Sequence, residues 1–190
     1  MPDQPAPYPL AVITASVRPD RIGPTVTRWL LRHLERHPAA AVDHIDLADL
    51  DLPGDLAGGG DAEGFTKRID RADAFVVVTP EYNHGYPGPL KTALDTAYVE
   101  WRAKPLGFVS YGGASGGLRA VEQLRGVLAE LHVSTMRTGV MIPDVHEAFD
   151  EHGELRRPER AEAGLAAMLR QLDWWARTLR RGRAERAYDC

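Results

Sequence analysis

The segment TASVRPDRIGPT brings a hydroxyl group and two guanidinium groups close to an expected helix start. Ser16, Arg18 and Arg21 stand in this loop, and Gly23 and Thr25 lie where the helix is expected to begin. Hydroxyl and guanidinium groups beside the unpaired N–H groups of a helix start suit a phosphate monoester. The segment therefore predicts a phosphate site, and the alternative is an ordinary capped loop with solvated arginines.

The segment TPEYNHGYPGP combines proline, glycine and polar aromatic residues. Its three prolines restrict the backbone, and its two glycines permit conformations that other residues resist. Such a backbone suits contact with a flat molecule, and Tyr82, Asn83 and His84 can offer polar groups to a heteroaromatic ring. The alternative is a rigid connector that only packs.

The segment SYGGASGGLR contains four glycines, which let backbone N–H groups approach a ligand closely. These residues are Gly112, Gly113, Gly116 and Gly117. They are not the dinucleotide fingerprint, because that motif follows a first strand and these glycines follow a fourth.

Apolar runs that predict strands alternate with repeats of helical spacing between these segments. Strands are expected at residues 10–14, 41–47, 74–79, 105–112 and 134–142, and helices at 25–37, 65–71, 88–101, 116–132 and 157–182. This alternation predicts right-handed βαβ units and a three-layer α/β sandwich with a mostly parallel sheet. The three segments should then meet at the edge where the strands end, which is where such folds bind ligands.

Composition favours one domain over residues 1–190, with a core at about 9–143 and a C-terminal helical extension at about 158–182. The 23 basic and 27 acidic residues argue against a nucleic-acid-wrapping protein. Cys190 is the only cysteine, which excludes an internal disulfide and fits a reducing cytoplasm. No apolar run is long enough to span a membrane, and the N-terminal segment lacks the features of a signal peptide.

Three further features have simple interpretations. The helix Pro89–Trp101 has an apolar stripe beside small residues, which suits packing across a two-fold axis. The terminal helix should pack through a stripe of Leu165, Met168, Leu169, Leu172 and Trp175; Trp174 is also expected to pack, with a subunit contact as the alternative. His146, Glu147 and His152 match no metal motif, so this segment is expected to be a solvated loop and no metal site is predicted.

The stretches SVRPDRIGPTV, TPEYNHGYPGPLKTALD and SYGGASGGLRAVEQLR resemble the NADPH-dependent FMN reductase family of flavodoxin-like proteins. The resemblance extends over roughly residues 10–142. It implies a five-stranded parallel sheet of order 2-1-3-4-5, FMN at the sheet edge, and a homodimer or homotetramer.

The resemblance also implies roles for individual residues. The phosphate-loop roles fall on Ser16 and Arg18, with Thr25 as a weaker match. The flavin-ring roles fall on Pro80, Glu81, Tyr82 and Asn83 in one loop and on Tyr111, Gly112, Gly113 and Gly116 in the other. Glu81, Lys91 and Arg119 match positions of structural or subunit-bridging ion pairs.

The expected activity is hydride transfer from NADPH or NADH to FMN and on to an acceptor such as free flavin or a quinone. In such an enzyme the flavin carries the chemistry and the protein orients it. The N–H groups of Gly112 and Gly113 are expected to face N1 and O2 of the flavin, and no side chain is assigned as a catalytic acid or base. A non-enzymatic FMN electron carrier and a flavin-free sensor domain are the alternatives. A flavin-dependent monooxygenase is a candidate partner.

Overall fold

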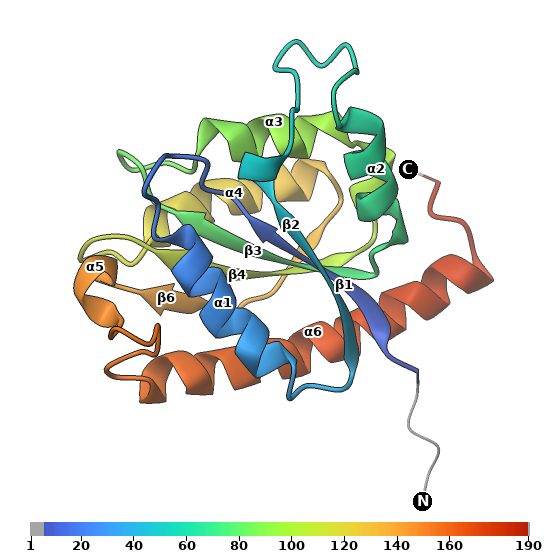
Figure 1. The fold of residues 1–190 in the computed structure, drawn as a ribbon. Helices are drawn as coiled ribbons and strands as arrows, with labels where there is room; N and C mark the ends of the chain where they lie inside the picture. Colours follow the sequence, from blue (N-terminus) through green and yellow to red (C-terminus); the bar gives the residue numbers. More distant parts are fainter. Residues whose placement is uncertain (1–5, 190) are drawn as a thin grey trace, which may run out of the picture.

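The computed structural model describes residues 6–189 and consists of a central sheet with helices on both faces (Figure 1). The expectations about Cys190 and about the first five residues lie outside the described residues. The strands are β1 (Tyr8–Thr14), β2 (Ala40–Asp46), β3 (Ala74–Pro80), β4 (Pro105–Tyr111), β5 (Ser134–Thr135) and β6 (Val140–Ile142). The helices are α1 (Gly23–Leu34), α2 (Ala62–Arg71), α3 (Gly88–Thr96), α4 (Leu118–Glu130), α5 (Val145–Ala148) and α6 (Glu159–Glu185), with short 3-10 turns at Leu47–Asp49 and Val99–Trp101.

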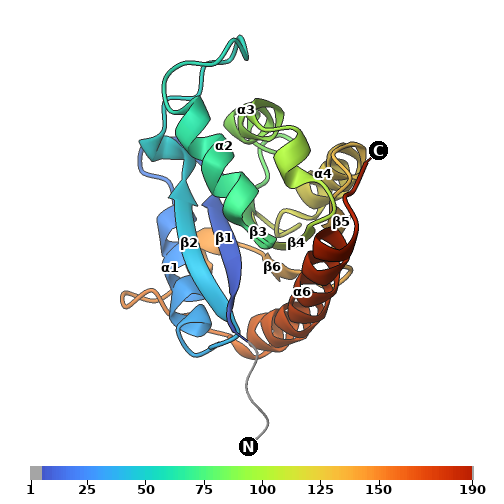
Figure 2. The ribbon, with the colours of Figure 1, turned by 90° about the vertical axis from the view of Figure 1, so that its right-hand side faces the viewer.

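The sheet order is β2-β1-β3-β4-β5, as predicted, and every pairing between these strands is parallel. Successive side chains of a strand point to opposite faces, so each central strand contributes to two cores. Leu10 and Val12 of β1 pack with α1 and α6, whereas Ala11 and Ile13 pack with α2, α3 and α4. Figure 2 shows the resulting three layers.

The strand predicted at 134–142 is two short strands that both pair with β4. Ser134 and Thr135 pair with the start of β4, and β6 pairs with its end. Between them the Met136 N–H still donates to the Leu106 carbonyl, and Arg137 to Gly139 then interrupt the pairing. A Cβ on Gly139 would come within 3.0 Å of the Phe108 carbonyl oxygen, so the chain passes close to β4 at this point.

The helix predicted to end at Trp101 ends at Thr96, because Ala97 has extended backbone angles. Its apolar stripe is not free for a partner, since Leu90, Ala93 and Leu94 are buried in the core of the same chain. These three residues of the stripe are therefore not available for a contact across a two-fold axis.

Helix α6 covers one face of the sheet and is buried along four of the five predicted stripe residues: Leu165, Met168, Leu169 and Leu172. Trp175 is the exception, with 38% of its surface exposed, and Ala176 takes the buried position. Trp174 is also exposed, and the two indole rings contact each other edge to face with centroids 5.1 Å apart. No helix in residues 6–189 is long and apolar enough to cross a membrane.

Candidate functional site

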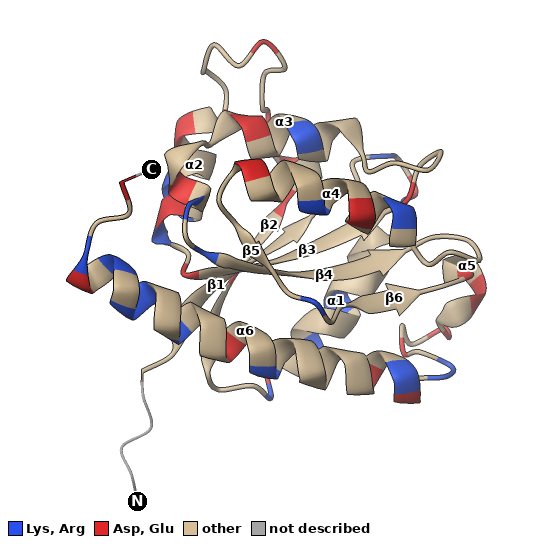
Figure 3. Cartoon of the chain, turned by 180° about the vertical axis from the view of Figure 1, so that it is seen from behind, with Lys and Arg blue, Asp and Glu red and all other residues tan. Residues whose placement is uncertain are grey.

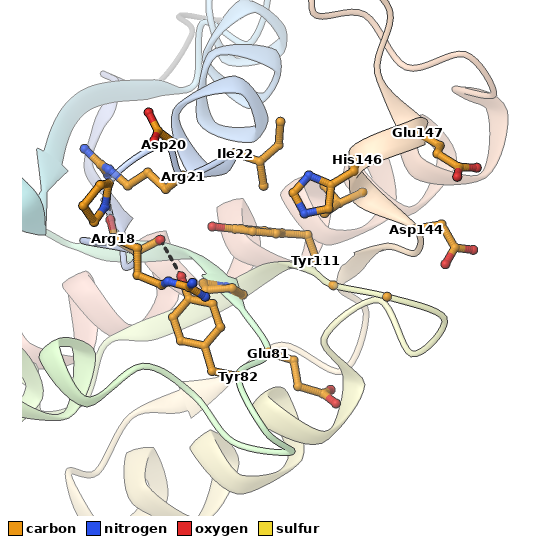
Figure 4. Close-up of a pocket in the computed structure, with 16 residues that line it drawn as sticks. Arg18, Asp20, Arg21, Ile22, Glu81, Tyr82, Tyr111, Asp144, His146 and Glu147 are labelled. Carbon is orange, nitrogen blue, oxygen red and sulfur yellow. Dashed lines mark hydrogen bonds between the residues drawn. The ribbon is translucent and has the colours of Figure 1, made fainter.

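A cavity of about 500 Å³ lies at the edge of the sheet where β1, β3 and β4 end (Figure 4). Its lining residues come from the three predicted segments and from a fourth segment that follows β6. They are Ser16, Arg18, Pro19, Asp20, Arg21, Ile22, Pro80, Glu81, Tyr82, Tyr111, Gly112, Gly113, Asp144, Val145, His146 and Glu147. The convergence follows from the parallel order of the strands, whose C-terminal ends share one edge.

Most of the sequence-predicted site residues line this cavity. They are Ser16, Arg18, Arg21, Pro80, Glu81, Tyr82, Tyr111, Gly112 and Gly113. Four predicted residues, Gly23, Thr25, Asn83 and Gly116, are not among its lining residues. Gly116 instead lines a neighbouring cavity, and Thr25 lies inside the first turn of α1.

The first and second segments are joined by two side-chain contacts. The hydroxyl groups of Ser16 and Tyr82 share a hydrogen bond of 2.8 Å. The guanidinium carbon of Arg18 lies 5.3 Å from the centre of the Tyr82 ring, within the range of a cation–π contact. Arg18 forms no ion pair with a described residue, so its charge is available to a ligand.

Arg21 has a different environment, because it is held by Asp46 at the end of β2. Two hydrogen bonds of 2.7 and 2.9 Å join its guanidinium group to the carboxylate, and a third of 2.6 Å reaches the Ser16 carbonyl. The hydrogen bond with Asp46 raises the pKa of Arg21. Its charge is therefore already neutralised within the protein, and its main role is to fix the loop.

The backbone of the first loop offers N–H groups to a ligand. Among the described residues, none accepts a hydrogen bond from the N–H groups of Arg18, Arg21, Ile22 or Gly23. Helix α1 has no side-chain N-cap and no acidic residue in its first turn. Unpaired N–H groups at the positive end of a helix favour an anion.

Tyr111 is buried in the wall of the cavity, with 3% of its surface exposed, yet its hydroxyl group has no hydrogen-bond partner in the described structure. Burial raises the pKa of this hydroxyl, so it is a neutral donor. A Cβ on Gly23 would come within 2.8 Å of the Tyr111 oxygen, which places the hydroxyl against the start of α1. A buried polar group without a partner is costly unless a ligand or water satisfies it.

The second segment forms a tight turn from Tyr82 to Gly85. The N–H and carbonyl groups of these two residues exchange hydrogen bonds of 2.9 and 3.0 Å. Asn83 and His84 between them have φ angles of 48° and 69°, which is the left-handed region that non-glycine residues rarely adopt. Gln123 stabilises this turn through a 2.8 Å hydrogen bond to the His84 carbonyl. The turn is thus preformed, with Asn83 exposed beside the cavity rather than lining it.

In the glycine segment only one of the two expected N–H donors is available. The N–H group of Gly112 donates to the Ile142 carbonyl over 3.2 Å, so it is already used within the protein. The N–H group of Gly113 has no partner among the described residues, and its carbonyl accepts from Gly116 and Asp144. Gly113 therefore remains the candidate donor in this segment.

Glu81 lines the cavity, but its carboxylate is bound within the protein. It accepts hydrogen bonds from the Arg119 guanidinium group, from the Arg119 N–H group and from the Ser115 hydroxyl. Burial raises the pKa of Glu81, but these hydrogen bonds outweigh it and lower the pKa overall. Lys91, which was grouped with this pair, instead bonds Asp95 one turn along α3.

The fourth segment, Asp144 to Glu147, was missed by the sequence prediction, which placed His146 and Glu147 in a solvated loop. Val145 to Glu147 belong to the short helix α5, and Asp144 precedes it. All four residues line the cavity, and His146 lies beside Ile22 (Figure 4). One feature of the sequence could have placed this segment at the site: it follows the C-terminal end of a predicted parallel strand, as the other three loops do. In the described part of the chain, no group of three or more His, Cys, Asp or Glu residues is arranged to hold a metal ion.

The fold and the cavity at the strand ends define a flavodoxin-like protein with a site for an anionic ligand. The family model for NADPH-dependent FMN reductases matches residues 9–147, and the chain belongs to this family. It is an FMN-dependent NAD(P)H oxidoreductase, and the alternative of a non-enzymatic electron carrier is not favoured.

Relatives of known name agree with this assignment. An NAD(P)H-dependent FMN reductase of Schizosaccharomyces pombe is 36% identical over 173 residues, which cover 78% of this chain and 85% of the relative. A probable NADPH:quinone oxidoreductase of Oryza sativa is 32% identical over 153 residues, covering 75% of each chain.

Solved structures support the fold. The flavoenzyme NAD(P)H:(acceptor) oxidoreductase FerB from Paracoccus denitrificans superposes with a TM-score of 0.69 at 23% identity, over 90% of this chain and 98% of its own.

Proposed function

We propose that this oxidoreductase holds FMN in the cavity at the ends of β1, β3 and β4 and passes hydride from NAD(P)H to a small acceptor. The observation that carries the proposal is the unpartnered hydroxyl group of Tyr111, buried against the start of α1. It lies in a cavity whose volume of about 500 Å³ is within the usual range for bound small molecules. We further propose that residues 1–190 act as one flavin-binding domain.

The phosphate end of FMN fits the first loop. Arg18 supplies a positive charge that no described carboxylate neutralises, and the loop backbone supplies unpaired N–H groups. Tyr111 would add a neutral donor beside the start of α1. Together they give a phosphate both charge and directed hydrogen bonds, as recognition of this group requires.

The flavin ring fits the part of the cavity between the second and third segments. Pro80 and Tyr82 form one wall, and the Gly113 N–H group is free to face the polar edge of the ring. Bound FMN supplies the hydride-transfer chemistry. The residues of this chain orient the ring and keep its phosphate end fixed, and we assign none of them as an acid or base.

The relatives are named as FMN reductases and quinone oxidoreductases, so we propose free flavin and quinones as the acceptors to test. The expected monooxygenase partner and the cytoplasmic location remain predictions.

A homodimer or homotetramer is also a proposal, although the stripe on α3 no longer supports it. Tyr98 and Val99, each with 56% of its surface exposed, follow α3 and are apolar residues that a second copy would cover. Sedimentation of the FMN-loaded protein tests this, and a monomer at micromolar concentration would contradict it.

The flavin-binding proposal is tested by titrating flavin-free protein with FMN and with riboflavin, following flavin fluorescence. Wild-type protein should bind FMN much more tightly than riboflavin, because only FMN carries the phosphate. Tyr111→Phe should weaken FMN binding by about threefold to tenfold, the effect of one hydrogen bond, and leave riboflavin binding unchanged. Equal losses for both flavins would place Tyr111 away from the phosphate, and no binding of either flavin by wild-type protein would reject the site.

A further inference from the structure

A second cavity, of about 790 Å³, adjoins the flavin cavity and has no role in the proposal above. Asp144 and Glu147 line both cavities, so the second begins where the first ends. The two cavities also divide the glycine segment, with Gly113 lining the first and Gly116 the second. A ligand that reaches the flavin from this side would extend into the second cavity.

The lining of the second cavity combines apolar and charged residues. Met141, Pro143, Ala148 and Leu155 contribute the apolar surface. The acidic residues shared with the flavin cavity are Asp144 and Glu147, at α5. The arginines lie at the start of α6 and in the turn before it, with Glu159 among them, and Figure 3 colours these charged segments of the chain. This arrangement suits a ligand with a flat ring and an anionic group far from the flavin.

The arginines that line this cavity are Arg156, Arg157 and Arg160, and none of them forms an ion pair with a described residue. They differ in this respect from Arg21, whose charge is neutralised by Asp46. Glu159 lies among them and also has no ion-pair partner in residues 6–189, so the net charge of the cluster is positive. Three guanidinium groups that form no ion pair with a described residue and line one cavity are suited to a phosphate group.

The turn that carries this cluster is held in place by the rest of the chain. The Arg156 N–H group donates to the Ala148 carbonyl over 2.9 Å, which closes the turn. Arg32 of α1 donates to the Gly153 carbonyl over 2.7 Å and pairs with Glu154 at 2.8 Å. The arginines therefore extend from a fixed backbone, which lowers the entropic cost of binding.

We propose that the second cavity binds the adenosine end of NADPH and that Arg156, Arg157 and Arg160 contact its 2′-phosphate. This inference rests on the proposed function, because the nicotinamide must reach FMN in the first cavity. The 2′-phosphate lies at the opposite end of NADPH from the nicotinamide, and the arginines line only the second of the two cavities. Asp144 and Glu147 line both cavities, and their carboxylates suit the ribose hydroxyl groups of the dinucleotide. The cluster lies beyond residue 147, where the match to the family model ends.

The first test is direct binding without turnover. FMN-loaded protein is titrated calorimetrically with 2′,5′-ADP, which carries the 2′-phosphate, and with 5′-AMP, which lacks it. Wild-type protein should bind 2′,5′-ADP at least tenfold more tightly than 5′-AMP, the effect of one charge-assisted hydrogen bond. The double variant Arg157→Gln and Arg160→Gln should lose this preference. Arg170→Gln removes another exposed arginine, from helix α6, and should keep the preference.

The second test separates substrate binding from chemistry. In the double variant, KM for NADPH should rise about tenfold or more at unchanged kcat, whereas KM for NADH should change less than twofold. Reduced nicotinamide mononucleotide, which has no adenosine, should be oxidised at the wild-type rate. An equal change for NADPH and NADH, or unchanged binding of 2′,5′-ADP, would overturn the inference.

The two proposals fail in different ways. If wild-type protein bound no FMN, the flavin site itself would be rejected. If wild-type protein bound FMN and oxidised reduced nicotinamide mononucleotide, but the double arginine variant kept the wild-type preference for the 2′-phosphate, only the inference about the second cavity would fail.

Discussion

Arg18 and Arg21 lie three residues apart in the same loop, yet their guanidinium groups have different partners. Arg18 contacts the Tyr82 ring and no carboxylate, whereas Arg21 is bound to Asp46 through two hydrogen bonds. The side chains of Arg21 and Asp46 are only 16% and 11% exposed, so this pair is largely shielded from solvent. The two arginines should therefore respond differently to the same substitution.

We expect Arg18→Gln to weaken FMN binding by about tenfold, because it removes a charge that faces the phosphate site. Its stability and its kcat at saturating FMN should stay close to the wild-type values. Fluorescence titration of FMN and turnover with added FMN measure the two effects. Full flavin occupancy with lost turnover would contradict the assignment.

Arg21→Gln should instead destabilise the fold by about 2 to 4 kcal/mol, because it leaves the shielded Asp46 carboxylate without its partner. Denaturant unfolding of the flavin-free protein measures this loss without interference from ligand binding. The Arg18 variant is its matched control. If Arg21→Gln were as stable as wild-type protein, the pair would not fix the loop.

The connection between β4 and α4 depends on Gly117, which has a φ angle of 87° at the N-terminal boundary of the helix. A Cβ on this residue would lie 2.7 Å from the Ser110 Cβ and 2.9 Å from the Tyr111 nitrogen, and backbone atoms cannot move aside easily. Gly126, inside the same helix, is exposed, and nothing lies within 4 Å of a Cβ built on it. The two glycines therefore offer a matched pair for one helix.

Gly117→Ala should lower the free energy of unfolding by at least about 2 kcal/mol, through steric strain and an unfavourable φ angle. Gly126→Ala should raise it by about 0.5 to 1 kcal/mol, because alanine is the better helix former. Chemical denaturation of both variants gives the comparison. Effects of the same sign would show that the strain at Gly117 is relieved by movement of the loop.

The strands differ in how far their sequences predict them. The run AFVVVT predicts β3 because a strand that is buried on both faces of a sheet has a continuous apolar sequence. In the structure every side chain of β3 is buried. The run from Ser134 to Ile142 predicts one strand in the same way, but its interruption depends on the close approach of Gly139 to the Phe108 carbonyl. That contact is between distant parts of the chain, and no local pattern reports it.

Contacts between distant parts of the chain also decide those features of the site that the sequence does not predict. The loops that follow β1, β3 and β4 are predicted from proline, glycine and arginine content, whereas the role of Asp46 depends on its position at the end of β2, next to Thr14 of β1. The α5 segment contains no glycine or proline signature, and it joins the cavity only because β6 pairs with β4. The use of the Gly112 N–H group by Ile142 follows from the same pairing.

The edge of the sheet opposite the cavities contains a buried lysine that links α2 to β4. The Lys104 ammonium group donates to the carbonyls of Ile69 and Asp70 over 2.9 and 2.7 Å, and the residue is 5% exposed. Burial, followed by the nearby charge of Arg183, lowers its pKa from 10.5 to about 8. Between pH 8 and 10.5 the unfolded chain therefore binds a proton that the folded chain has released.

Because the unfolded state holds more protons in this range, Lys104 makes the protein more stable as pH rises from about 8 to 10.5, by at most about 3 kcal/mol. Below pH 8 both states are protonated, and the contribution no longer changes with pH. Urea unfolding across this range should show that the free energy of unfolding of wild-type protein rises with pH relative to that of Lys104→Met. The exposed Lys67, replaced in the same way, controls for the loss of a charge. A difference independent of pH would show that Lys104 is charged throughout.

Both described ends of the chain lie at this same edge. Strand β1 begins there at Tyr8, and the end of α6 is fastened there by hydrogen bonds of 2.6 Å from Arg183 to Asp73 and to the Ala103 carbonyl (Figure 1). The two cavities open at the other edge, about one strand length away. Attachment of the protein to an electrode or a solid support through either end should therefore leave its substrate entrance facing the solution.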